Sequence, residues 1–107
     1  MKLTPYTPDP RLLHRDESAI SLTEVYRLGS ETVRVRVRSD FYVPQSYAVA
    51  EVLTPARTWT QLATRSPETW HAKSSAILGA STLREVAADL LDAATKILGY
   101  ETEGNDL

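Results

Sequence analysis

Three carboxylates recur at helical spacing near the C-terminal end of the chain: Glu85, Asp89 and Asp92. Residues at positions i, i+4 and i+7 share one face of a helix, and three carboxylates on one face could bind a hard cation. No second source of ligands accompanies them, and Lys96 follows Asp92 at the four-residue spacing of a helical ion pair. The pattern favours a solvated acidic helix face, so we expect no metal site.

Catalytic patterns are equally weak. His14 and His71 are the only histidines and lie far apart in the sequence, so they do not indicate a metal site. A serine–histidine–aspartate catalytic triad could be imagined with His71 as its base, but neither a nucleophile elbow nor an oxyanion loop accompanies it. None of the four glycines forms a phosphate-binding loop. We expect a non-enzymatic protein without a cofactor.

The strictest pattern in the chain is Val33-Arg34-Val35-Arg36-Val37-Arg38. Strand side chains point to opposite faces in turn, so one face of this segment must carry three valines and the other three arginines. Aromatic residues of two later segments could join the arginines, although a one-residue slip in register would exchange the faces. The candidate partner-binding residues are Arg34, Arg36, Arg38, Tyr47 and Trp59.

A face that mixes arginine with aromatic and aliphatic residues is typical of an interface, and three interpretations are open. It could bind a protein partner or a second copy of the chain, with Glu51 pairing an arginine of the other subunit. It could instead bind single-stranded DNA or RNA, because arginine pairs with phosphate and aromatic rings stack on bases. The arginines could also protect a sheet edge from unwanted pairing.

We expect a small module that self-associates or docks on a protein partner, with nucleic-acid binding as the alternative. The net charge of −2 argues against a general polyanion binder. The charge is nevertheless uneven: residues 32–73 have three more cationic than anionic side chains, whereas residues 74–107 have four more anionic ones. Such a separation of charge can govern the choice of partner.

Four segments show the composition and alternation of strands, and short connections separate them. Gly29–Glu31 predicts a hairpin turn, and Pro55 suits the second position of a type I turn. Asp40, Tyr42 and Gln45 lie at the bend around Pro44, where loop polarity explains them better than a small polar site does. The predicted strands are 18–28, 32–38, 45–53 and 58–64.

Residues 82–98 predict an amphipathic helix. Thr82 and Glu85 form a capping-box pattern, and Gly99 suits the position just after the helix. Residues 65–80 could contain a helical turn at Ser66–Glu68 or a short strand over 73–78. The apolar stripe of the helix comprises Leu83, Val86, Ala87, Leu90, Leu91, Ala94, Ile97 and Leu98.

These elements predict an α+β fold: a four-stranded antiparallel β-meander with one C-terminal amphipathic helix on one face, in the order β-β-β-β-α. We expect a single domain over 18–99, an extended proline-containing arm over 1–17 and an acidic tail over 100–107. The chain of 107 residues has no cysteine and shows neither a leader segment nor a membrane-spanning run, so we expect a soluble cytoplasmic protein.

Overall fold

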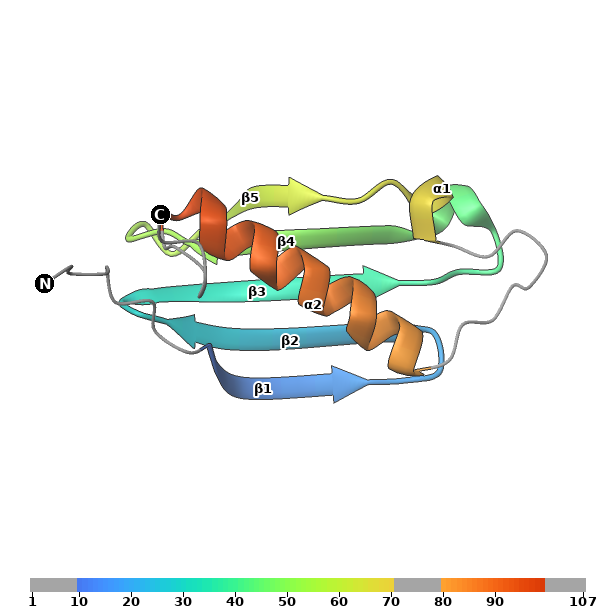
Figure 1. Ribbon diagram of the computed structural model, residues 1–107, viewed down its shortest axis with the longest axis horizontal. Helices are drawn as coiled ribbons and strands as arrows, with labels where there is room; N and C mark the ends of the chain where they lie inside the picture. Colours follow the sequence, from blue (N-terminus) through green and yellow to red (C-terminus); the bar gives the residue numbers. More distant parts are fainter. Residues whose placement is uncertain (1–9, 71–79, 100–107) are drawn as a thin grey trace, which may run out of the picture.

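The computed structural model describes residues 10–70 and 80–99, and places one long helix across one face of an antiparallel sheet (Figure 1). The sheet has five strands in chain order, and the fold is α+β. Two short helical turns, η1 (Val43–Gln45) and α1 (Pro67–Trp70), precede the long helix α2 (Ala80–Ile97). The strands are β1 (Arg11–Glu17), β2 (Ser21–Leu28), β3 (Glu31–Arg38), β4 (Tyr47–Leu53) and β5 (Trp59–Thr64).

The prediction of four strands was wrong by one, because Arg11–Glu17 forms β1 where we expected part of an extended arm. β1 pairs with β2 at the edge of the sheet and carries charged residues on both sides of Leu12 and Leu13. Six of its seven residues are exposed, so no alternation of buried and exposed positions marks it as a strand. A register shift between Leu12 and His14 breaks the pattern further.

Two turns adopt the backbone conformation that their residues favour. Gly29 adopts a positive φ of 61° in the two-residue turn between β2 and β3, as hairpin turns of this length require. Between β4 and β5, the backbone N–H of Arg57 donates to the carbonyl of Thr54, which closes the turn predicted around Pro55. Arg57 itself has φ 65°, a conformation that residues other than glycine rarely adopt.

The core lies between α2 and one face of the sheet. Val33, Val35 and Val37 are buried there together with Ala48 and Ala50, as the alternation in β3 predicted. Strand register places these residues opposite one another, and the small alanines let the helix approach closely. The buried helix residues of the core are Leu83, Val86, Ala87, Leu90 and Ala94.

The amphipathic helix is confirmed, with slightly different ends. It begins at Ala80, so Thr82 lies inside the helix instead of before its first turn. Gly99 follows the helix with φ 95°, which fits its predicted role after the C-terminus. No helix in the described part of the chain is long and apolar enough to cross a membrane.

Ion pairs join the edge strand β1 both to its neighbour β2 and to the helix α2. Arg15 donates to Glu24 at 2.7 Å, and Tyr26 donates to the same carboxylate at 2.9 Å. Glu24 is only 3% exposed, so these two donors replace the water that the charged group loses on folding. Glu17 accepts from Arg84 of α2 at 2.7 and 2.9 Å. The helix is thereby attached to the outermost strand.

Between β5 and α2, the structure describes one short element. α1 supplies the helical turn predicted near Ser66–Glu68, with bounds Pro67–Trp70. The alternative short strand at 73–78, together with His71, lies outside the described residues. The same holds for residues 1–9 of the predicted arm and for the predicted tail.

Candidate functional site

The face of the sheet opposite α2, here called the open face, carries the candidate residues. Strand register pairs Arg34 with Glu51 and Arg36 with Val49 across β3 and β4. These four residues lie on the face of the sheet opposite to the one that carries the buried valines. Trp59 lies on the same face, because it pairs across β4 and β5 with Leu53, which is two residues after Glu51. β3 is the central strand, which excludes the interpretation of its arginines as protection for a sheet edge.

Glu51 organises this face. Its Oε1 atom accepts from Nε of Arg34 at 2.9 Å and from Nε of Arg36 at 3.0 Å, and its Oε2 atom accepts from Nη2 of Arg36 at 3.1 Å. Burial alone would raise the pKa of Glu51, but the hydrogen bonds from the two guanidinium groups outweigh it and hold the pKa below the ordinary glutamate value. The carboxylate is therefore ionised at neutral pH.

Two aromatic rings flank this ion-pair cluster. The guanidinium carbon of Arg34 lies 4.2 Å from the ring centre of Trp59, and that of Arg36 lies 5.6 Å from the ring centre of Tyr47. Both distances fall within the range of cation–π attraction. The resulting sequence of contacts, here called the arginine row, runs across three strands and comprises Trp59, Arg34, Glu51, Arg36 and Tyr47.

Arg38 extends the cationic character of the open face toward the loop between β3 and β4. Its Nη2 donates to Asp40 at 3.0 Å, while the other carboxylate oxygen of Asp40 accepts from the backbone of Tyr42 at 2.9 Å. Asp40 therefore orders this loop. In the same loop, Phe41 is 84% exposed and Tyr42 is 60% exposed. The prediction for this bend rested on its polar residues and omitted Phe41, although two adjacent aromatic residues in a polar loop can indicate an interaction surface.

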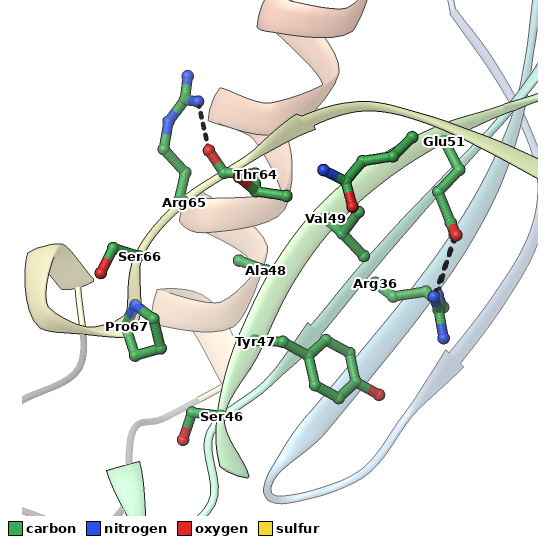
Figure 2. A pocket seen from close by; sticks show the side chains of 11 residues that line it. Arg36, Ser46, Tyr47, Ala48, Val49, Glu51, Thr64, Arg65, Ser66 and Pro67 are labelled. Atoms are coloured by element: carbon green, nitrogen blue, oxygen red, sulfur yellow. Dashed lines mark hydrogen bonds and ion pairs between the residues drawn. The ribbon is translucent and has the colours of Figure 1, made fainter. Parts of the chain in front are cut away.

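A hollow of about 490 Å³ lies on the open face beside the arginine row. Figure 2 shows the side chains of Tyr47, Val49, Glu51 and Arg36 gathered over β3 and β4, with α2 on the far side of the sheet. Arg65 lies at its rim but turns toward the helix, where it donates to Asp89 at 2.8 Å. The lining residues are Arg36, Ser46, Tyr47, Ala48, Val49, Glu51, Gln61, Thr64, Arg65, Ser66 and Pro67.

The other candidates do not converge. Asp89 pairs with Arg65, and Asp92 pairs with Lys96 at 3.2 Å, so two of the three helix acids are engaged by cations. His14 lies exposed on β1. Among residues 10–70 and 80–99, no three histidine, aspartate or glutamate side chains are grouped to hold a metal ion.

Chemically, the open face can recognise anionic and aromatic groups. Each guanidinium has five N–H donors, of which Glu51 receives one from Arg34 and two from Arg36. The remaining donors can reach a carboxylate or phosphate, and the flanking rings offer apolar contact. No protein-family model, curated protein or solved structure matches this chain.

Proposed function

We propose that the chain is a non-enzymatic binding module whose open face docks on an acidic surface of a protein partner. The observation that carries this proposal is the arginine row. Arg34 and Arg36 are held by Glu51 between Trp59 and Tyr47, on a sheet face that α2 leaves uncovered. Arginine, tryptophan and tyrosine are the residues most enriched where protein interfaces gain their binding energy.

Pre-organisation supports this role. The ion pairs fix both arginines before a partner arrives, so less side-chain entropy is lost on binding. Tyr47 is 40% exposed, and its ring stands beside the hollow, where it can cover an inserted side chain. The exposed pair Phe41 and Tyr42 lies at the end of the sheet where β4 begins and enlarges the aromatic surface.

Charge favours an acidic partner over a second copy stacked on the same face. Register places Arg27 on the open face beside Arg34, Arg36 and Arg38, while Glu51 and Asp40 are the carboxylates paired with the β3 arginines. Two identical faces would therefore bring like charge together. The pairing of Glu51 with an arginine of another subunit also loses its basis, because arginines of its own chain already occupy this carboxylate.

Binding of single-stranded nucleic acid is the second candidate. The specific observation that favours it is the position of Trp59 and Tyr47 on either side of two arginines, since such rings can stack on bases while the guanidinium groups pair with phosphates. The engagement of both arginines by Glu51 reduces the charge available to a polyanion. We therefore place this function second.

The test is a selection of displayed random peptides on the intact chain, followed by titration of the enriched sequences. We expect enrichment in aspartate and glutamate, with affinity falling about tenfold or more in Tyr47→Ala, as for a central interface residue. Arg38→Gln should weaken binding less, and Lys96→Gln on α2 is the control that removes one charge from the other layer. In the described part of the chain, the hydrogen bonds of Glu51 come from Arg34 and Arg36, so we expect the Tyr47 and Arg38 variants to keep the central ion pairs.

Peptides that bind equally to wild type and Tyr47→Ala would overturn the protein-docking proposal. Fluorescence anisotropy with labelled single-stranded DNA and RNA separates the second candidate. Micromolar binding that weakens steeply with salt and is reduced in Arg38→Gln but not in Lys96→Gln would place nucleic acid first.

A further inference from the structure

The two edges of the sheet differ sharply in charge. β1 at one edge contains Arg11, His14, Arg15, Asp16 and Glu17 among its seven residues. β5 at the other edge reads Trp-Thr-Gln-Leu-Ala-Thr and contains neither a charged residue nor a proline. Charged side chains and prolines are the usual means by which proteins prevent an edge strand from pairing with another chain. β1 is protected in this way. β5 has neither a charge nor a proline, and the irregularity in its pairing with β4 is a register shift at Leu62.

We propose that β5 pairs with β5 of a second copy of this chain across a two-fold axis, joining the two sheets edge to edge. In the described part of the chain, β5 has one neighbour only, β4, so its outer row of backbone donors and acceptors is available for pairing. Figure 1 shows β5 as the outer strand, with α1 turned back toward the start of β4 instead of lying along the outer edge.

A second copy of β5 suits this edge better than the terminal segments of the chain do. An isologous pair places each strand opposite itself, which is unfavourable when the strand is charged and free of repulsion when it is not. Residues 1–9 include Pro5 and Pro8, which cannot donate to a strand ladder. Residues 100–107 combine three acids with glycine and asparagine, a composition depleted in strands.

The helix layer offers an additional apolar contact at the same edge. α2 contacts β5, and its C-terminal end lies beside the start of that strand (Figure 1). Ile97, the last residue of α2, is exposed there although it belongs to the apolar stripe of the helix. Ile97 therefore adds one apolar side chain beside the uncharged edge.

The arrangement has a consequence for the open face. A two-fold axis perpendicular to the joined sheet keeps both open faces on the same side. Gln61 and Thr64 of β5 line the hollow, so the two hollows would lie on either side of the axis. A partner with two acidic segments could then engage both sites at once and gain affinity from the linkage. Self-association and face docking remain separate, because the first uses the edge and the second uses the face.

The first experiment measures molar mass in solution by light scattering and sedimentation, from low micromolar to near-millimolar concentration. We expect dimers whose fraction rises with concentration. Thr60→Lys, which places a charge on the exposed edge strand, should shift the chain to monomers. His14→Lys, the matched lysine on the opposite edge, should leave the dimer unchanged. Circular dichroism checks that both variants are folded.

The second experiment uses the absence of cysteine from the chain. Single variants Thr60→Cys and Gln61→Cys place one thiol on β5, and His14→Cys places one on β1. Under mild oxidation we expect a covalent dimer from at least one β5 variant, because paired residues of adjacent strands come within disulfide range. A monomer at every concentration would overturn the proposal. So would a dimer that persists in Thr60→Lys, or equal cross-linking from His14→Cys.

Discussion

Replacement of Glu51 by glutamine removes the one negative charge within the arginine row. Glu51 is 8% exposed and accepts three hydrogen bonds from Arg34 and Arg36, at 2.9 to 3.1 Å. Glutamine keeps the shape of the side chain, but its amide nitrogen is a donor where the carboxylate offered an acceptor. Two guanidinium groups on adjacent positions of one strand face are then left without a neutralising charge.

The expected loss of stability lies between two limits. Removal of one partner from a fully buried ion pair costs about 3–5 kcal/mol, whereas an exposed pair contributes about 0–1 kcal/mol. The carboxylate side chain is 11% exposed, but its two partners are 25% and 36% exposed, so water can partly solvate the orphaned arginines. We expect Glu51→Gln to lower the free energy of unfolding by about 2 kcal/mol, which corresponds to a fall in Tm of about 10 °C.

The assay is denaturant unfolding of wild type and Glu51→Gln, followed by circular dichroism, with thermal unfolding as a second readout. Asp92→Asn is the matched control, because it breaks an exposed ion pair to Lys96 on α2 and should cost less than about 0.5 kcal/mol. If Glu51→Gln were no more destabilising than Asp92→Asn, the arginine row would not be a pre-organised unit. Docking through the arginine row would then lose its main support.

The same variant has a predicted pH dependence. The pKa of Glu51 is lower in the folded chain than its ordinary value, because the hydrogen bonds from Arg34 and Arg36 outweigh the effect of burial. Such a group contributes stability above its unfolded pKa, about 4.3, and this contribution is lost as pH falls through the lower, folded value. The stability difference between wild type and Glu51→Gln should therefore shrink below about pH 4.3, and a constant difference would contradict this account.

Two further substitutions test the fold around the site. Arg57→Gly should leave stability in denaturant unfolding unchanged or raise it by up to about 1 kcal/mol. Glycine adopts the φ of 65° without strain, but it loses more chain entropy on folding, so the two effects oppose each other. A loss above about 1 kcal/mol would show that the arginine side chain matters more than the backbone. Leu90→Ala should cost about 2–5 kcal/mol in the same assay, because Leu90 is fully buried between α2 and the sheet; a cost below 1 kcal/mol would mean that the helix packs loosely.

The periodic spacing of apolar residues was enough to predict much of the fold from the sequence. The alternation of Val33–Arg38 predicted one buried and one open face of β3, because strand side chains have a period of two. The stripe from Leu83 to Leu98 predicted the face of α2 that covers the valines, except that Ile97 is exposed. Gly29 and Pro55 predicted turns that the structure contains. Glycine accepts the positive φ that a hairpin turn requires, and proline has a fixed φ that suits the second position of a turn.

β1 could not be identified in the same way. An edge strand is paired on one side only, and the side chains of β1 are almost all exposed. Neither face of it had to be apolar, so the sequence of Arg11–Glu17 resembles a charged linker. Apart from the ion pair between Arg15 and Glu24, its pairing with β2 comes from backbone hydrogen bonds that any residue except proline can make. Those bonds leave no trace in the pattern of side chains.

The candidate site, too, was predictable from the sequence only in part. Residue types and parity alone were enough to select Arg34, Arg36, Arg38, Tyr47 and Trp59 as possible members of one face. Register across three strands decided that Glu51 lies between two of the arginines and engages both, and that these arginines belong to the central strand β3 instead of an edge strand. The sequence by itself determines which side chains alternate, because that is a local property of each strand. Only the tertiary structure decides which strands are neighbours and in what register, because those depend on hydrogen bonds and packing between distant segments.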